Sequence, residues 1–164
     1  MRIAVMQKGV NRMSTNRGKQ FENVIKESFE KAKDTVVVRL HDQTNGFIGS
    51  KNPCDFIVYH EPRMFAIECK SVHGNTFPLS NITENQYSEL LKMSKIRGVY
   101  AGVIVWWIDK DVTKFFDINW IKYLKEEDYK SIHYSVEKGI PINGKKKRVF
   151  FDYDMEGFFN GLRY

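Results

Sequence analysis

The chain has 164 residues, enough for one domain with a hydrophobic core, and 42% of them are hydrophobic, as in soluble globular proteins. Lysine and arginine total 26 against 20 acidic residues, which gives a net charge of +6 and a pI of about 9.2. This excess favours a polyanionic partner, with nucleic acid ahead of a membrane surface. The sequence shows no apolar run of membrane-spanning length, no clean amphipathic basic helix and no signal-peptide pattern, so we expect a cytoplasmic protein without membrane contact.

The cysteine and histidine pattern argues against a disulfide framework and against structural zinc. Cys54 and Cys69 lie inside expected strands, and a single cysteine pair in a basic chain without a secretion signal predicts buried, inert thiols. The four histidines show no zinc-ligand spacing with these cysteines.

The N-terminal region divides into an arm and a helix. Residues 1–13 are basic and without a clear period, so we expect a flexible arm that either touches the DNA backbone or frays without a role. The rest of the chain, 14–164, predicts a single domain. It begins with an amphipathic helix, because Phe21, Ile25 and Phe29 recur at helical spacing.

This helix carries one carboxylate at the border of its buried stripe. Glu22 either points across the sheet towards other acids or pairs with Lys26 one turn later. Arg17 and Lys19 lie at the start of the helix, where cations oppose the helix dipole. Their position indicates a phosphate partner.

A strand and a long loop follow the helix. Residues 35–40 are rich in β-branched side chains and predict a strand. Residues 41–53 are rich in glycine and asparagine and predict a loop, in which Lys51 comes just before the next strand. Loops on a rigid sheet often carry function, so we count Lys51 among the candidate DNA contacts.

Residues 54–60 and 64–70 predict a β-hairpin with a turn around Pro62. Because side chains alternate along a strand, Glu68 and Lys70 face the same way.

The register of the hairpin has two alternatives. A turn centred just before Pro62 puts Asp55 directly opposite Glu68. A turn centred one residue later puts Asp55 opposite Lys70, with Glu68 as its diagonal neighbour. Either register brings the two carboxylates within about 5 to 8 Å.

Two carboxylates at that separation repel each other, which raises one pKa or recruits a cation. Mg²⁺ suits such a pair, since it takes oxygen ligands and keeps waters that a phosphate can displace. Lys70 beside the pair could steady or deprotonate an attacking water. The alternative is a solvated hairpin face with an ordinary Glu68/Lys70 pair, because the E-x-K pattern by itself is common.

Residues 82–98 predict a second helix, with a capping box formed by Thr83 and Gln86. Lys92 and Lys95 lie near its C-terminus. The helix dipole and a DNA backbone contact account for these two cations equally well.

The last third of the chain predicts more strands and a helix. Residues 99–107 are almost continuously apolar and predict a central strand covered on both faces. Residues 113–118 predict its antiparallel neighbour, and a helix capped by Asn119 follows. A basic hairpin tip, which is either a solvated turn or a phosphate contact, is formed by Lys145, Lys146, Lys147 and Arg148.

Four segments in this order resemble a known superfamily: NRGKQFE around Glu22, PCD ending at Asp55, ECK at 68–70 and GNTFPLSNITENQ at 74–86. They are similar to the PD-(D/E)-x-K nucleases and, within them, to the RecU-type Holliday junction resolvases of Gram-positive bacteria and their phages. The resemblance spans roughly residues 16–118. It implies an α/β fold with a restriction-endonuclease-like α-β-β-β-α-β core, whose mixed central sheet is flanked by helices.

The resemblance also implies roles by position. Asp55 and Glu68 would bind Mg²⁺, with Mn²⁺ as a substitute, together with the backbone carbonyl of Cys69. Lys70 would assist the attacking water. Glu22 would be a further acidic member of the site, acting on that water or on a second ion.

Gln86 occupies the position of a polar residue that supports the site, although its capping box already accounts for it. The family acts as homodimers that nick opposing strands of four-way DNA junctions in recombination, repair or phage DNA processing. The 41–53 segment is shorter than the protruding insertion of that family. Two other functions therefore stay open: a phage nuclease or nickase on other branched or duplex DNA, and a non-catalytic DNA-binding accessory factor on a nuclease-like scaffold.

Overall fold

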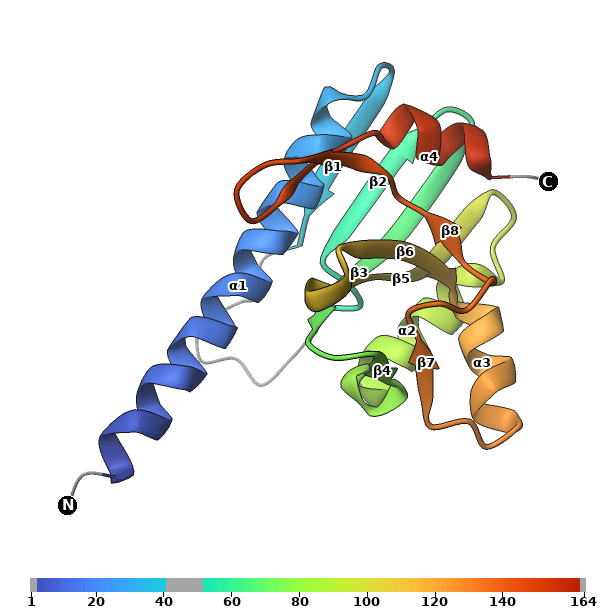
Figure 1. Ribbon diagram of the computed structural model, residues 1–164. Coiled ribbons are helices and arrows are strands. Elements are labelled where there is room, and N and C mark those ends of the chain that lie inside the picture. Colours follow the sequence, from blue (N-terminus) through green and yellow to red (C-terminus); the bar gives the residue numbers. More distant parts are fainter. Residues whose placement is uncertain (1–2, 41–51, 163–164) are drawn as a thin grey trace, which may run out of the picture.

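A computed structural model describes the chain over residues 3–40 and 52–162, with side chains described from residue 17 onward (Figure 1). Its helices are α1 (Ile3–Lys31), α2 (Glu84–Ser94), α3 (Ile118–Glu126) and α4 (Met155–Gly161). Its strands are β1 (Thr35–Arg39), β2 (Phe56–His60), β3 (Arg63–Val72), β4 (Thr76–Pro78), β5 (Val99–Trp107), β6 (Val112–Asp117), β7 (Ser131–His133), β8 (Ile140–Pro141), β9 (Gly144–Lys146) and β10 (Phe151–Tyr153).

The centre of the molecule is a six-stranded sheet in the order β1-β2-β3-β5-β6-β8. The β3/β5 pair is parallel and the other neighbours are antiparallel, so the sheet is mixed. One core layer packs α1 and α4 against one face of the sheet, and a second layer packs α2 and α3 against the other (Figure 1). The expected fold, an α/β core of order α-β-β-β-α-β, is confirmed.

The apolar strand β5 runs through the middle of this sheet. Side chains alternate along it, so Trp106 packs into the core layer under α1 while Trp107 packs into the layer under α2. Both indoles are fully buried. The expected central strand with two covered faces is therefore present.

Helix α1 begins much earlier than the sequence pattern predicted. The apolar period starts at Phe21, and we expected the helix from residue 14, but the helical backbone already starts at Ile3. Figure 1 shows the N-terminal half of α1 projecting beyond the sheet. A helix without a packing partner needs no apolar stripe, which is why periodicity missed this half. The flexibility expected for residues 1–13 stays a prediction.

Two further local details differ from the sequence prediction. Helix α3 is capped by Asp117, whose carboxylate accepts the N–H of Asn119 at 2.7 Å, so the expected cap was placed two residues too late. Helix α4 and the small β4/β7 sheet had no counterpart in the prediction. Within the described part of the chain, no helix is long and apolar enough to cross a membrane.

The close packing of β5 against β6 leads to a stability prediction. A Cβ built on Gly102 would lie 2.3 Å from the backbone oxygen of Phe116 and 2.6 Å from the ring of Phe115. Gly102→Ala should therefore lower the free energy of unfolding by about 2 kcal/mol or more, because buried backbone cannot move aside. Urea unfolding followed by circular dichroism measures the change.

The matched control is Gly18→Ala in α1, where an added Cβ meets nothing within 4 Å. This substitution should raise stability by about 0.5–1 kcal/mol, since glycine is a poor helix former. Equal stability of the Gly102→Ala protein and the wild type would contradict the packing described for β5.

Candidate active site

The β2–β3 hairpin brings the two central carboxylates together. Phe56 pairs with Ile67, and the N–H of Asp55 also donates to the carbonyl of Ile67 at 3.0 Å, so both residues face Ile67, as in a β-bulge. Asp55 therefore lies beside this pair at the end of the hairpin, where the charge of Glu68 acts on it. Of the two registers considered from the sequence, the one with the turn centred before Pro62 is confirmed.

Asp55 is held by the backbone of the opposing strand. Its Oδ2 accepts the N–H of Cys69 at 2.7 Å. This bond stabilises the ionised carboxylate, but burial and the charge of Glu68 act more strongly and raise the pKa of Asp55 to about 7. The Asp55 carboxyl is therefore poised to exchange a proton for another cation near neutral pH.

Glu68 is 3% exposed, and both Lys70 and Gln86 contact its carboxylate. Lys70 Nζ lies 2.8 Å from Glu68 Oε1, as expected for two residues on the same side of one strand. Gln86 Nε2 donates to the same oxygen at 2.5 Å. Strand and helix thus both fix the orientation of this carboxylate.

Gln86 combines the two roles between which the sequence could not decide. Its backbone N–H donates to Thr83 Oγ1, and its side-chain Oε1 accepts the N–H of Thr83 at 3.1 Å, which completes the capping box of α2. The other end of the same amide binds Glu68. The cap therefore orients the amide group that reaches the acidic pair.

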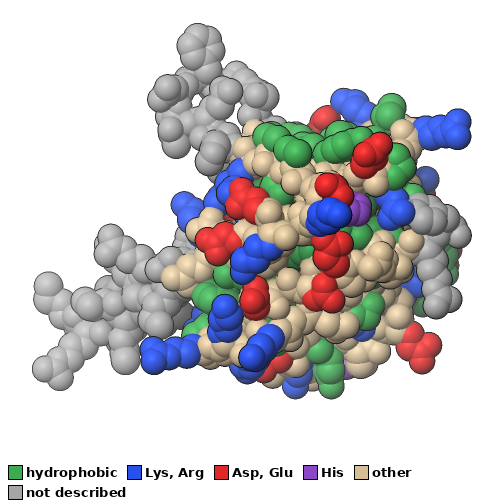
Figure 2. Space-filling model, turned by 90° about the horizontal axis from the view of Figure 1, so that it is seen from above, with side chains coloured by type: hydrophobic (Ala, Val, Ile, Leu, Met, Phe, Trp, Pro, Cys, Tyr) green, Lys and Arg blue, Asp and Glu red, His purple; other side chains and the backbone are tan. Residues whose placement is uncertain are grey.

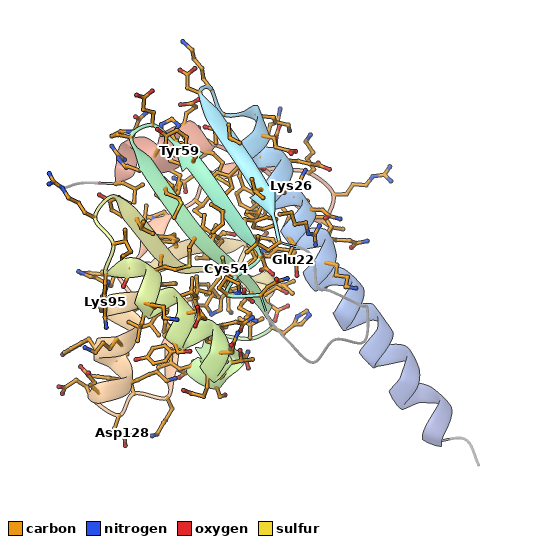
Figure 3. The ribbon with its side chains drawn as sticks, turned by 180° about the vertical axis from the view of Figure 1, so that it is seen from behind. Glu22, Lys26, Cys54, Tyr59, Lys95 and Asp128 are labelled. Carbon is orange, nitrogen blue, oxygen red and sulfur yellow. The ribbon has the colours of Figure 1, made fainter. Side chains whose placement is uncertain are left out.

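Glu22 lies at the border of the site, on α1. Figure 3 shows it beside Cys54, the residue before Asp55, and its negative charge contributes to the raised pKa of Asp55. Lys26 is not its partner, because the ammonium of Lys26 pairs with Glu30 at 2.5 Å. The partner is Arg39 instead.

Arg39 is the site residue that the sequence reading missed. Its Nη2 lies 2.6 Å from Glu22 Oε2, its Nη1 donates to Asn23, and its guanidinium lies over the ring of Phe56 at 5.9 Å from the centroid. Alternation along β1 places Arg39 on the same face as Val37, which packs under α1. That pattern could have pointed to Arg39 as a partner for an acid on the helix.

The oxygen ligands here fit a small, hard cation. Among the described residues, no group of three or more His, Cys, Asp or Glu side chains could hold a metal ion. A cation at this site would therefore rest on Asp55 and Glu68, with the backbone carbonyl of Cys69 as a candidate third oxygen. Mg²⁺ is commonly bound by one or two carboxylates together with waters and substrate phosphates.

Both cysteines are free and buried, as expected. Burial and the charge of Glu68 raise the pKa of Cys54 to about 12, and burial raises the pKa of Cys69 as well. Both thiols therefore favour the protonated, less reactive form, and their inertness stays a prediction.

The cations expected to contact DNA lie in three separate places. Arg17 and Lys19 are on α1 within two turns of Glu22. Lys92 pairs with Glu89 at 3.1 Å near the end of α2, and Lys95 lies well away from Glu22 in Figure 3. Lys51 lies outside the described residues.

The third group is the β9–β10 hairpin, where Lys146 pairs with Asp111 and Lys147 lies 3.8 Å from Asp152. Lys145 and Arg148 are exposed. Figure 2 shows basic and acidic side chains interspersed over the viewed face, so that face carries no patch of one sign. A role of all these cations in DNA binding stays a prediction.

Comparison with known proteins identifies the family of this chain. The family model of recombination protein U, RecU, matches residues 16–153. Comparison with the curated proteins gives no match. Among solved structures, the chain is similar to Hjc, a Holliday junction resolvase from the archaeal hyperthermophile Archaeoglobus fulgidus, with a TM-score of 0.50 and 18% identity. The match covers 77% of this chain and 88% of Hjc, and at that identity it shows the fold alone.

The matched residues 16–153 include Glu22, the hairpin with Asp55 and Glu68, and Gln86. The chain therefore belongs to the RecU family of recombination proteins.

Proposed function

We propose that this protein is a metal-dependent endodeoxyribonuclease that resolves four-way DNA junctions by paired nicks. The observation that carries the proposal is the proximity of two largely buried carboxylates at the end of the hairpin: Asp55 is bound by the N–H of Cys69 and feels the charge of Glu68, and Lys70 is bound to Glu68 at 2.8 Å. Membership of the RecU family and the fold shared with Hjc supply the junction as substrate. We further propose that the protein works as a homodimer in the cytoplasm.

The metal that best fits this site is Mg²⁺, with Mn²⁺ as a substitute. Burial and then the charge of Glu68 raise the pKa of Asp55, so a bound cation would stabilise its ionised form. When bound, a divalent ion polarises the scissile phosphate and makes water a stronger nucleophile. Asp55 and Glu68 would hold it, with the carbonyl of Cys69.

The remaining side chains would orient the reactants. Lys70 can steady or deprotonate the attacking water and offset charge that develops on the phosphate, and its contact with Glu68 fixes where its ammonium lies. Gln86 keeps Glu68 oriented. Glu22, held by Arg39, would support the water from the α1 side.

A phage nuclease or nickase that acts on other branched or duplex DNA is the second candidate. The observation that favours it is the short connection between β1 and β2, since only 16 residues separate Arg39 from Phe56. The protruding insertion that the resemblance implied would be longer.

Cleavage of a four-way junction and of a matched linear duplex, with and without Mg²⁺, tests the proposed function. We expect Mg²⁺-dependent cleavage of the junction in preference to the duplex. Asp55→Asn and Lys70→Ala should each lower the cleavage rate about 100-fold or more while DNA binding persists, because they remove a ligand and the ammonium at the reacting phosphate.

The matched controls are Asp128→Asn and Lys130→Ala. They break an exposed ion pair whose members are two residues apart, as Glu68 and Lys70 are, and which lies far from the site (Figure 3). Both should cleave like the wild type. Equal cleavage of junction and duplex would favour the second candidate. Full activity of Asp55→Asn and Lys70→Ala would refute the catalytic assignment.

The pKa of Asp55 leads to a prediction about stability without metal. The folded-state value of about 7 lies above the ordinary 3.8, so folding disfavours the ionised carboxylate. The resulting destabilisation is absent below about pH 4, grows as the pH rises and is complete above about pH 7. In EDTA at about pH 8, Asp55→Asn should therefore raise the free energy of unfolding by about 1–3 kcal/mol, with little change near pH 4.

Asp109→Asn is a control for which we expect the opposite change in the free energy of unfolding. The N–H of Gly74 and the side chain of His73 lower the pKa of Asp109, so this variant should lose stability at pH 8. Added Mg²⁺ should stabilise the wild type and not Asp55→Asn. If Asp55→Asn were no more stable than the wild type in EDTA at pH 8, the acidic pair would not be strained.

The double role of Gln86 can be separated by two substitutions. Gln86→Glu keeps an acceptor for the N–H of Thr83 but replaces the donor to Glu68 with a third negative charge, so cleavage should fall about tenfold or more. Thr83→Ala should lower stability by about 1 kcal/mol through loss of the cap, with near-normal cleavage. Unfolding curves and initial cleavage rates measure both effects. Equal cleavage by the wild type and Gln86→Glu would show that the cap is its only role.

A further inference from the structure

A histidine and an aspartate are joined just beyond the active site, at the end of β3. His73 is the first residue after β3, and Asp109 lies in the short helical turn (Ile108–Lys110) that follows β5. The parallel strands β3 and β5 end together, with Val72 opposite Trp107, so the pair lies at the end of the sheet nearest Lys70 (Figure 1). The hydrolysis proposed above needs neither of the two side chains.

Asp109 holds the ring of His73 in one orientation. Its Oδ1 lies 3.0 Å from His73 Nδ1, and its Oδ2 accepts the N–H of Gly74 at 2.6 Å, so both carboxylate oxygens have a partner. The N–H of Gly74 and then the His73 ring lower the pKa of Asp109, which therefore stays ionised over the range in which histidines titrate. An ionised carboxylate only accepts hydrogen bonds, so the proton of the ring lies on Nδ1.

A phosphate group is the ligand that suits the other ring nitrogen, Nε2, on a side chain that is 61% exposed. With the proton on Nδ1, the Nε2 of a neutral imidazole can only accept a hydrogen bond. Phosphate oxygens are acceptors as well, so Nε2 binds one only after it takes up a proton of its own. The imidazolium would then lie between two anions, Asp109 at Nδ1 and the phosphate at Nε2.

A metal ion is a poorer fit at this position. One imidazole is too few ligands, and the described part of the chain contains no group of three or more His, Cys, Asp or Glu side chains that could hold a metal. The neighbouring residue is a cation, since Lys110 follows Asp109 and is exposed. A positive charge there favours an anionic ligand over a metal ion.

The position of His73 matches a phosphate close to the one that is cleaved. His73 follows Lys70 by three residues, which is at most about 10 Å along an extended chain. Successive phosphates of one DNA strand advance by about 3.4 Å along the duplex axis. A strand whose scissile phosphate lies at Lys70 therefore brings another phosphate, about three nucleotides away, within reach of His73.

Protonation of His73 changes the charge of this edge. The charged and titratable groups on the neighbouring segments are Asp109, Lys110, Asp111, Lys146 and His133. Asp111 pairs with Lys146, and His133 contacts Ser135. Asp109 and Lys110 carry opposite charges, so the edge gains net positive charge when His73 takes up a proton.

We propose that His73, held by Asp109, is a phosphate-binding subsite that takes up a proton when it binds the DNA strand beside the scissile phosphate. No covalent bond changes: one proton moves from solvent to Nε2, and Nε2–H donates to a phosphate oxygen. The proposal rests on the proposed function only in taking DNA as the ligand, because it concerns binding and not cleavage.

Binding of a fluorescent four-way junction in EDTA, followed by anisotropy over a range of salt concentrations, tests the subsite. His73→Gln keeps a donor for Asp109 but cannot carry a charge. At about pH 5.5 this variant should bind about three- to tenfold more weakly than the wild type, and the slope of log affinity against log salt should be smaller by about 0.9. At about pH 8 the two proteins should bind alike, because His73 is then neutral.

The variants must be compared at each pH, because Asp55, with a pKa of about 7, also takes up a proton in this range. His73→Lys is charged at both pH values and should extend the tight binding to about pH 8. Asp109→Asn should reduce the gain in affinity on acidification, whereas loss of a general repulsion between Asp109 and DNA would leave that gain unchanged.

The matched control is His60→Gln, the same substitution at the other end of β2, where the ring stacks on Phe159. It should keep the pH and salt dependence of the wild type. Circular dichroism checks that each variant is folded.

A second experiment locates the contact on the DNA. Neutral methylphosphonate replaces the phosphates near the crossover one at a time. At about pH 5.5 one position should weaken binding by the wild type and leave His73→Gln unaffected, because both changes remove the same contact.

The outcomes separate the subsite from the proposed function. If His73→Gln bound the junction like the wild type at both pH values and only lost stability, the pair would be a clip between two loops and the proposal would be wrong. An equal loss of affinity at both pH values would overturn the coupling to a proton, and a wild type that binds no DNA would overturn the subsite. Proton-linked binding through His73 by a protein that cuts no junction would support the subsite, and only the proposed function would fail.

Discussion

The site depends on the register of a single hairpin. A connection of two residues, Glu61 and Pro62, joins β2 to β3 and fixes Phe56 opposite Ile67, which leaves Asp55 and Glu68 close together at the open end. A slip of one residue would turn every side chain of one strand to the other face of the sheet. Phe65 and Ile67 of β3 are buried in the layer under α1, so such a slip would turn Glu68 into that apolar layer. The packing of the core therefore holds the two carboxylates together.

Holding two acids in this way strains the metal-free protein, and the surrounding groups relieve the strain only in part. Lys70 and Gln86 both bind Glu68, whereas Asp55 has the N–H of Cys69 and a pKa raised to about 7. Sites that act on other molecules often retain such uncompensated charge, because the substrate or cofactor supplies the missing partner. Here a divalent ion that binds together with a DNA phosphate would be the missing partner of the two carboxylates.

The face of the sheet that α2 partly covers carries different kinds of side chain at its two ends. At one end it carries the acidic pair, covered by α2 through Gln86, and at the other it carries exposed valine and tyrosine side chains. Because α2 reaches β3 and stops short of β1, the fold leaves these two regions adjacent.

Local sequence determined much of this protein. Strand alternation put Glu68 and Lys70 side by side, the capping box located α2, and the apolar run located β5, because each depends only on a short period or a nearby hydrogen bond. Only the tertiary structure chose between the two hairpin registers, paired Glu22 with Arg39 instead of Lys26, and showed that Gln86 serves the helix and the site at once. These contacts join residues from different elements, and the packing of helix on sheet, which no local pattern encodes, decides their distances.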